Sequence, residues 1–415
     1  MKLLLILISV LLTQASISAA YECSGAFVHK GGGIVTVSPF DLGDGQRHFL
    51  FVDFRTGYIR ILKEEANEFT AGATLFSDSP IELRIQCAGK ELHWKINDAS
   101  DEAVRISVTE EKVRFSNGTI HLAGTLYIPQ TKSYASVVLL HGSGSLNRYS
   151  FGPMAYFFAA SGITVLAYDK RGTGESSGNL DEATLNELAE DGAAAVQYLR
   201  GRKEVDPKSI GLWGSSQGGF LAASVASRTN PLRFIVNQSG MYVPVWQQEI
   251  YRTKAEMTSQ GFSAKEISTA LDYLNLFFEV AKTGNDWPKL QQRMQELKDQ
   301  KWFDVVPHID NLKNLQWYWN TLYSFDPVKP LQNVSCPVLG VFGGLDRSTP
   351  VPETVENIKR GLTKAQFEYR IFPTANHGLL EAKTGSEREI PALTHLIPEA
   401  FEYQLSWIMK VLTSN

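Results

Sequence analysis

The sequence predicts an α/β protein with a mostly parallel central sheet, a helical insertion and a small N-terminal β-rich domain. Two observations lead to this fold class. From Ala135 onward, strands that are apolar on both faces alternate with helical stretches, as in a parallel sheet covered by helices. Before about Lys112, short apolar runs are separated by Gly, Asp, Asn and Pro, a pattern typical of β-strands joined by turns.

Length and composition narrow the class of partner. A chain of 415 residues exceeds a usual single core, which favours one large α/β domain and a smaller one. The net charge of −4 and the absence of a long basic run argue against a nucleic-acid partner and favour a small-molecule substrate. No Cys or His cluster has metal-ligand spacing, so no metal or other cofactor is expected. No signal points to a particular oligomeric state.

Residues 1–20 have the pattern of a secretory signal peptide. Lys2 precedes the apolar run Leu3–Leu12, and the small residues Ser18-Ala19-Ala20 predict cleavage near Ala20. The alternative is an uncleaved anchor, but the apolar run is far shorter than the roughly 20 residues of a membrane-spanning helix. We therefore expect an exported protein, periplasmic or secreted, with no membrane span in the mature chain.

Residues 21–111 are predicted to form the β-rich domain. It contains no recognisable catalytic constellation, so it is either a substrate-recognition or docking module or a packing appendage. Export would permit Cys23 to pair with Cys87 and leave Cys336 free, although sequence spacing alone does not show that two cysteines are close. The expected strands are Ile34–Val37, His48–Phe54, Tyr58–Leu62, Glu82–Gln86 and Glu91–Ile96.

Residues 112–415 are predicted to form the α/β domain. It opens with a hairpin whose turn contains Ser116-Asn117-Gly118. A closing helix is expected around Pro398–Leu412. The expected strands are Lys112–Phe115, Thr119–Tyr127, Val137–Leu140, Ile163–Tyr168, Ile210–Trp213, Phe234–Asn237, Pro337–Phe342 and Phe367–Phe372.

The alternation of strands and helices stops at about residues 241–329, where a largely helical insertion is expected. Such an insertion would lie over the strand ends as a lid. Its aromatic rings would either line an apolar pocket or form the core of the lid itself. The insertion contains five of the eight tryptophans: Trp246, Trp287, Trp302, Trp317 and Trp319.

The segment Gly214-Ser215-Ser216-Gln217-Gly218 has the G-x-S-x-G spacing of a nucleophile elbow. An apolar strand precedes it and an Ala-rich helical run follows it, which is the context that the motif requires. Ser216 is therefore the candidate nucleophile. Ser176 has the same spacing, but it lies in a polar loop with neither a strand nor a helix beside it.

A serine hydroxyl needs a base, and the base needs an acid that orients it. His377 follows the last expected strand and is the candidate base, ahead of His308 in the insertion and His395 near the closing helix. Asp346 follows the preceding strand and is the candidate acid. The runner-up acid is Asp326, which has the sequence context of a turn or a helix start.

Two backbone N–H groups are candidate donors to a developing oxyanion. One belongs to Gln217, directly after the nucleophile, and the other to Ser143 in the glycine-rich turn that follows a strand. His141, just before that turn, is expected to be structural. Asp169 and Arg171 are expected to order their own loop, because the glycines after them lack dinucleotide-binding spacing.

Three motifs, in this order, resemble the α/β-hydrolase superfamily in its branch of esterases and serine-aminopeptidase-like hydrolases: His-Gly-Ser-Gly, Tyr-Asp-Lys-Arg-Gly-x-Gly-x-Ser and Gly-x-Ser-x-Gly. The resemblance covers about Lys112 to Asn415 and implies hydrolysis of a small-molecule carboxylic ester through an acyl-enzyme, with Ser216, Asp346 and His377 as the catalytic triad. The resemblance does not extend to residues 21–111. The insertion is too variable in this superfamily for a substrate to be inferred from its relatives.

Two other functions stay open. A peptidase acting on short peptides would need an acidic site for the free amino terminus, and no Glu-Glu pair stands out apart from the surface-like Glu64-Glu65 and Glu110-Glu111. A non-catalytic binding protein on a hydrolase scaffold is the other alternative, because a fold alone does not establish activity.

Overall fold

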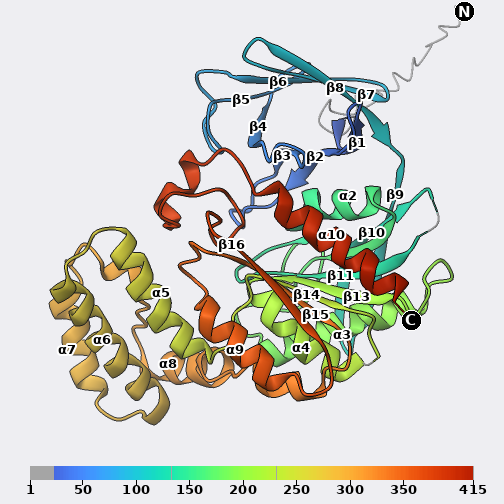
Figure 1. Cartoon of the computed structure of the whole chain (residues 1–415). Coiled ribbons are helices and arrows are strands. Elements are labelled where there is room, and N and C mark those ends of the chain that lie inside the picture. Colours follow the sequence, from blue (N-terminus) through green and yellow to red (C-terminus); the bar gives the residue numbers. More distant parts are fainter. Residues whose placement is uncertain (1–22, 132, 230, 415) are drawn as a thin grey trace, which may run out of the picture.

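The computed structural model describes residues 23–131, 133–229 and 231–414, so the predicted signal peptide lies outside the described residues. Within these residues the strands form two separate bodies, a closed antiparallel barrel of β1 to β8 and an eight-stranded sheet of β9 to β16. Figure 1 shows the barrel at one end of the molecule, above the sheet and its helices.

The barrel closes because its first strand pairs with its last, with Phe27 opposite Arg105. Its interior is packed with side chains, among them Phe51 and Trp94, so it is a core and not a channel. The strands are β1 (Gly25–His29), β2 (Ile34–Phe40), β3 (His48–Asp53), β4 (Ile59–Glu64), β5 (Phe69–Ala71), β6 (Leu83–Ala88), β7 (Glu91–Ile96) and β8 (Ala99–Ile106).

Strand β3 is apolar on both of its faces. Phe49 and Phe51 belong to the core inside the barrel, whereas Leu50 and Val52 belong to a different cluster, shared with the α/β domain. Successive side chains of a strand point to opposite faces. The outer face of the barrel at β3 is therefore turned toward the rest of the protein and not toward bulk water.

The large sheet is mixed, with the strand order β16-β15-β14-β13-β11-β12-β10-β9. The prediction of a mostly parallel sheet is correct for β11 to β16, but β10 is antiparallel to both of its neighbours. The strands are β9 (Val108–Asn117), β10 (Ile120–Pro129), β11 (Ala135–Leu140), β12 (Ile163–Tyr168), β13 (Ile210–Ser215), β14 (Ile235–Gln238), β15 (Val338–Gly343) and β16 (Phe367–Phe372).

The chain enters this sheet earlier than expected. Strand β9 begins at Val108, whereas the predicted domain boundary lies between residues 111 and 112. The whole length of β9 pairs with β10, from Asn117 opposite Ile120 to Val108 opposite Pro129. The polar residues Thr109, Glu110 and Glu111 hid this first part of the strand, because backbone pairing with β10 holds it rather than apolar periodicity.

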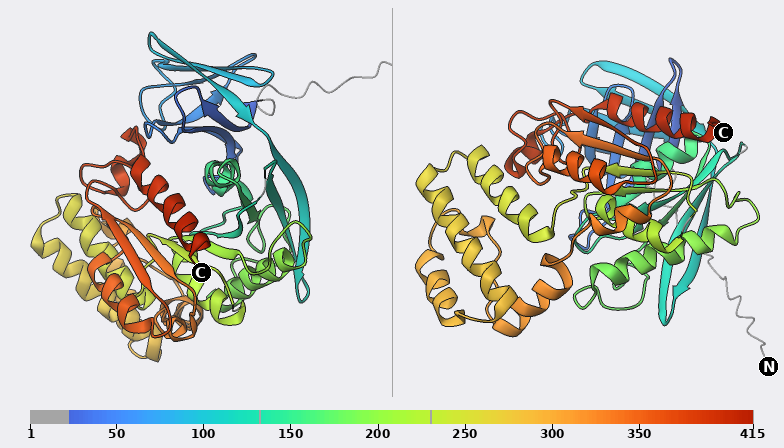
Figure 2. Two further views of the ribbon diagram at one scale, coloured as in Figure 1. Left: turned by 45° about the vertical axis from the view of Figure 1, so that its right-hand side comes forward. Right: turned by 60° about the horizontal axis from the view of Figure 1, so that its bottom comes forward.

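Helices cover both faces of the sheet (Figures 1 and 2). On β13, Leu212 packs into the cluster that contains α3 and α4, whereas the next residue, Trp213, packs into the cluster that contains α2 and α10. The helices are α2 (Gly152–Ala160) and α10 (Pro398–Thr413) on one face, and α3 (Leu185–Arg200), α4 (Gln217–Thr229) and α9 (Val351–Gly361) on the other.

The helical insertion lies between β14 and β15 and projects to one side of the sheet (Figure 2). Trp302 is fully buried, and the rings of Trp246 and Trp319 both lie 6.4 Å from the ring of Phe278. These three indole rings therefore build the insertion's own core. Its helices are α5 (Val245–Ser259), α6 (Ala264–Thr283), α7 (Trp287–Leu297) and α8 (Leu312–Tyr318).

The barrel is held against the α/β domain by backbone and ring contacts. The Ile59 N–H donates to the Thr394 carbonyl at 3.2 Å, and the Leu396 N–H donates to the Gly57 carbonyl at 2.8 Å. The ring of Phe54 lies 4.4 Å from that of Phe157 on α2. These contacts fix the outer face of the barrel relative to the sheet.

A disulfide joins Cys23, before β1, to Cys87 on β6, and Cys336 is a free buried cysteine. The two bonded residues are 64 positions apart, so the bond closes most of the barrel sequence into one loop. Such a crosslink restricts the unfolded chain.

We predict that replacing Cys23 and Cys87 together by Ala lowers stability by about 2–4 kcal/mol, because the unfolded barrel then gains conformational entropy. Thermal unfolding followed by circular dichroism measures the loss. Dithiothreitol should lower the midpoint of the unmodified protein but leave the double variant unchanged. Equal midpoints for both proteins without reductant would contradict the prediction.

Candidate active site

Ser216 lies at the sharp turn between β13 and α4. Its φ of 53° is in the left-handed region, which is strained for a serine. A Cβ at Gly218 would lie 2.0 Å from the Leu140 carbonyl oxygen, and one at Gly214 would lie 2.3 Å from the Gly218 backbone. Only glycine fits at either position, so the two glycines let the turn form and lift Ser216 above the sheet.

His377 and Asp346 come to Ser216 from two other strand ends. His377 lies in the loop after β16, and its Nε2 is 3.0 Å from Ser216 Oγ. Asp346 lies after β15, and its Oδ2 is 2.8 Å from His377 Nδ1. The structure therefore brings all three predicted residues into one hydrogen-bonded chain. Since parallel strands point the same way, their carboxyl ends meet at one edge of the sheet.

The Asp346 carboxylate is held in place on its other side. Its Oδ1 accepts hydrogen bonds from the backbone N–H groups of Ser348 and Thr349, both at 2.8 Å. The side chain is fully buried. These bonds leave Oδ2 directed at His377, which keeps the second ring nitrogen, Nε2, facing Ser216.

Charges around His377 favour its protonated form. Partial burial of the ring lowers its pKa, but the charge of Asp346, the hydrogen bond to Asp346 and the charge of Glu387 outweigh this effect and raise the pKa above its usual 6.5. The side chain is 32% exposed, so one edge of the ring stays accessible from the cavity beside it. His377 can therefore accept a proton from Ser216 and hold it as an imidazolium next to Asp346.

The two predicted oxyanion donors lie beside Ser216. Gln217 is the first residue of α4, so its N–H has no partner within the helix. Ser143 lies in the turn after β11, and both residues line a cavity of about 470 Å³ together with Ser216 and His377. The N-terminus of α4 adds a partial positive charge at this point.

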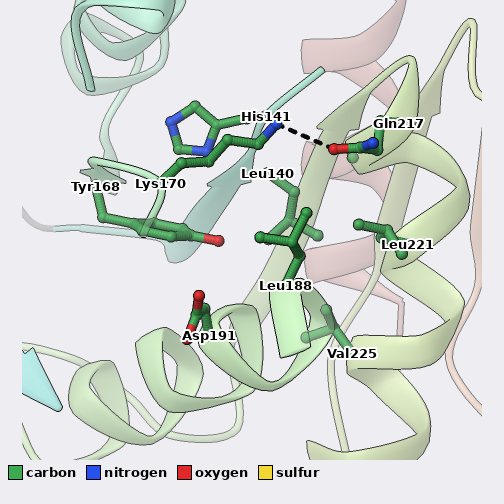
Figure 3. Close-up of a pocket in the computed structure, with 10 residues that line it drawn as sticks. Leu140, His141, Tyr168, Lys170, Leu188, Asp191, Gln217, Leu221 and Val225 are labelled. Carbon is green, nitrogen blue, oxygen red and sulfur yellow. Dashed lines mark hydrogen bonds between the residues drawn. The ribbon is translucent and has the colours of Figure 1, made fainter. Parts of the chain in front are cut away.

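Lys170 connects the two donor segments and was not predicted; Figure 3 shows its hydrogen bond to Gln217. Its Nζ donates to the carbonyls of Gly142 and Gly144, at 2.7 and 3.0 Å, and to Gln217 Oε1 at 3.0 Å. These carbonyls flank Ser143 on both sides. Burial lowers the pKa of Lys170 to about 7, whereas its three oxygen acceptors favour the ammonium form.

Ion pairs hold the loop around Lys170. Asp169 binds the Arg148 guanidinium through both carboxylate oxygens, at 2.9 and 2.6 Å, and Arg171 binds Asp191 at 2.7 and 2.8 Å. All four side chains are almost fully buried. Charge pairing thus fixes the residue on each side of Lys170.

The other candidate residues from the sequence lie in structural contacts. Ser176 donates to the Asp169 carbonyl and accepts from the Ala123 N–H. His395 packs against Tyr58 of the barrel, and His308 stacks on Phe303 in the insertion. Asp326 accepts from the Val328 N–H, as in a turn.

His141 lies below the oxyanion turn but within the core. It is 3% exposed, and its ring is 4.6 Å from that of Phe151 and 5.1 Å from that of Tyr168. Burial and the nearby charge of Lys170 hold its pKa well below 6.5. A neutral ring packed between aromatic side chains has a structural role.

The cavity beside Ser216 is more polar than the sequence suggested. Glu249 and Arg252 of α5 and Glu387 of the 3₁₀ segment Glu387–Ala392 line it, and none of the five tryptophans of the insertion does. For the tryptophans, the structure favours the alternative in which the rings form the core of the insertion, whereas Tyr323 is an aromatic residue of the insertion that lines this cavity. The carboxylates of Glu249 and Glu387 face this cavity, which bears on the acidic site that a peptidase would need. Glu249 is paired with Arg252 at 2.5 Å.

The described residues contain no cluster of three or more His, Cys, Asp or Glu side chains that could hold a metal ion. None of the helices in the described ranges combines the length and the apolar character needed to cross a bilayer.

Residues 131–383 match the family described as serine aminopeptidase, S33. The thiohydrolase aneE of Aspergillus aculeatus is 31% identical over 280 residues, which are 63% of this chain and 84% of that protein. The esterase EstD of Thermotoga maritima is 25% identical over 287 residues, 66% of this chain and 61% of EstD.

The match to the quorum-quenching protein AidA of Acinetobacter baumannii is 30% identical over 128 residues, and it spans 30% of this chain and 42% of AidA. Among solved structures, the α/β hydrolase GrgF from Penicillium has a TM-score of 0.48 at 16% identity and covers 74% of this chain and 100% of its own.

We predict that Glu387→Gln shifts the acid limb of the pH profile to lower pH. A general base must be neutral, so kcat/KM rises with pH through the pKa of His377. Removing the charge of Glu387 removes one of the contributions that raise this pKa. The measurement is kcat/KM for p-nitrophenyl acetate from pH 5 to 9, with the exposed Glu402→Gln as the control. An unchanged acid limb in Glu387→Gln would rule out this influence.

We predict that Lys170→Met lowers kcat about 10- to 100-fold. The turn around Ser143 would lose its anchor, and removing a single oxyanion donor outright costs about 10²- to 10³-fold. Steady-state kinetics on p-nitrophenyl acetate measures the effect. Lys208→Met removes an exposed lysine and should change nothing; a Lys170→Met enzyme with unaltered kcat would refute the positioning role.

Proposed function

The chain belongs to the S33 serine aminopeptidase family, within the esterase branch of the α/β-hydrolases, and from this membership we propose that it cleaves carboxylic esters through an acyl-enzyme. The observation that carries the proposal is the hydrogen-bonded chain from Ser216 Oγ through His377 to Asp346, at 3.0 and 2.8 Å. Each of these residues lies on a loop after a different strand.

The proposed reaction has two halves. His377 Nε2 takes the proton of Ser216 as Oγ attacks the ester carbonyl, and it then gives that proton to the departing alcohol. Asp346 stabilises the imidazolium and keeps its orientation. A water molecule, activated by the same imidazole, cleaves the acyl-enzyme and restores Ser216. No cofactor takes part in either half of the proposed reaction.

The N–H groups of Gln217 and Ser143 stabilise the oxyanion in each half-reaction. Three features support this assignment: the position of Gln217 at the start of α4, the presence of Ser143 on the same cavity wall, and the Lys170 bridge between their segments. The bridge lets the donors be in place before the negative charge forms.

A peptidase that requires a free amino terminus is the second candidate, and Glu387 favours it. This carboxylate faces the same cavity as Ser216, although it is far from Ser216 in the sequence. It could bind a substrate ammonium group. Parallel assays with p-nitrophenyl esters and alanine p-nitroanilide distinguish the two: an ester-only profile supports the esterase, and faster anilide cleavage supports the peptidase.

Thioesters are a further candidate bond, because the relative aneE is named a thiohydrolase. The same triad would attack a thioester carbonyl. Comparing butyrylthiocholine with p-nitrophenyl butyrate addresses this preference. A non-catalytic binding protein is the remaining alternative, and labelling of Ser216 by a fluorophosphonate probe would exclude it.

We also propose that the protein is exported, to the periplasm or the medium. The Cys23–Cys87 disulfide supports this, because such bonds form and persist in oxidising compartments. Mass spectrometry of the mature amino terminus tests the expected cleavage near Ala20.

We predict that Ser216→Ala lowers kcat for p-nitrophenyl butyrate by about 10⁴-fold or more, because the nucleophile is lost. Ser176→Ala is the matched control, since Ser176 has the same G-x-S-x-G spacing but lies in a structural loop. Circular dichroism checks that both variants fold. Undiminished turnover by Ser216→Ala would refute the proposed nucleophile.

A further inference from the structure

A second cavity, of about 370 Å³, lies between the barrel and the α/β domain. Its volume is within the range of small-molecule sites. Apolar side chains from both bodies form most of its wall. The barrel contributes the outward-facing residues of β3 and β4, and the α/β domain contributes residues of α2, β13 and α10. Six of these are Leu50, Val52, Ile61, Met154, Trp213 and Phe401.

This cavity reaches the active site. Gly142, Ser215 and Gly378 line it, and each is the direct neighbour of a proposed site residue: Ser143, Ser216 and His377.

Gly142 also lines the cavity beside Ser216, so it lies where the two cavities meet. A Cβ built on Gly142 would lie 3.8 Å from Ser216 Cβ and 3.9 Å from Leu146 Cδ1. The nucleophile and an apolar wall residue are thus separated by little more than the missing side chain of this glycine.

The two cavities differ in chemistry, and this difference orients a substrate. The cavity that contains His377 carries the charged side chains Glu249, Arg252 and Glu387. Because His377 must protonate the departing group, that group has to lie on the His377 side. The acyl group then extends from Ser216 to the other side, where the wall is apolar.

We propose that this second cavity, between the barrel and the α/β domain, binds the acyl chain of the substrate. The substrates are then esters of medium-length apolar acids with a polar alcohol part. This inference rests on the proposed ester hydrolysis. It assigns the barrel a direct function, because β3 and β4 form one wall of the acyl site.

The two-sided character of β3 and β4 supports this role. A barrel that was only a packing appendage would bury its outer apolar residues directly against its neighbour. Here Leu50 and Val52 of β3 are packed in the cluster shared with the α/β domain, but together with Ile61 of β4 they also line a space that the protein leaves open. Filling it with an alkyl chain removes apolar surface from water on both the chain and the wall.

The experiment is a chain-length series of p-nitrophenyl acetate, butyrate, hexanoate and octanoate on the full chain. We expect kcat/KM to rise up to about four-fold for each buried methylene. Ile61→Trp should fill the cavity and abolish the rise in kcat/KM, measured for each ester relative to the same variant's rate on acetate. Ile81→Trp adds the same side chain at an exposed barrel position that does not line the cavity, and it should keep the rise.

Met154→Trp provides a second test from the α/β side, in case Ile61→Trp does not fold. A flat or falling series for the unmodified protein, or an Ile61→Trp series equal to that of Ile81→Trp, would overturn the acyl site while the esterase assignment survives on acetate turnover.

Titration calorimetry with octanoate and butyrate on Ser216→Ala separates the site from the reaction. Octanoate should bind at least about ten-fold more tightly than butyrate, and Ile61→Trp on the same background should remove the difference. If no ester is hydrolysed, the proposed function fails. Equal affinity for both acids would then overturn the acyl site as well, whereas tighter octanoate binding would support it.

Discussion

The close approach of the α4 N-terminus to β11 is the constraint on which the site depends. Gly218 lies so near the Leu140 carbonyl that any side chain there would push the helix away. That contact accompanies the positive φ of Ser216, and it places Ser216 and Gln217 on the same cavity wall as the turn that follows Leu140. The proposed nucleophile, the proposed oxyanion donor and the turn that contains Ser143 are therefore parts of one packing arrangement.

The positions of the candidate residues directly after predicted strands are enough to predict much of the site. Ser216 and Asp346 each follow a short apolar strand, and His377 follows the last strand of the sheet. Parallel strands bring their carboxyl ends to one edge, so proximity follows from sequence pattern and topology together. Lys170 was missed for a definable reason. It lies within the motif that contains Asp169 and Arg171, but its role depends on the carbonyls of Gly142 and Gly144. Every residue has a backbone carbonyl, so the residue types do not show which carbonyls will accept a hydrogen bond.

The polarity of the two cavities could not be predicted, because it depends on which faces of distant elements meet. The tryptophan content of the insertion left open whether the rings line an apolar pocket or form the insertion's own core, and rings such as Trp302 lie in that core. Glu249 and Glu387 are far apart in the sequence, and only the fold of α5 against the loop after β16 brings them to one cavity. The sequence did contain one indication of the apolar cavity. The unbroken apolar run of β3 indicates a strand that is covered on both sides.

That run also explains why the barrel and the catalytic domain should be considered together. Hydrogen bonds between Ile59 and Thr394, and between Leu396 and Gly57, join β4 to the segment just before α10. The ring of Phe54 inserts between α2 and α10. Phe54, Ile59 and Leu396 also line the apolar cavity, so a change in docking would alter the space beside Ser216. In the proposed function, specificity for the acyl group and the chemistry of bond cleavage therefore depend on separate parts of the chain, and each can vary while the other is kept.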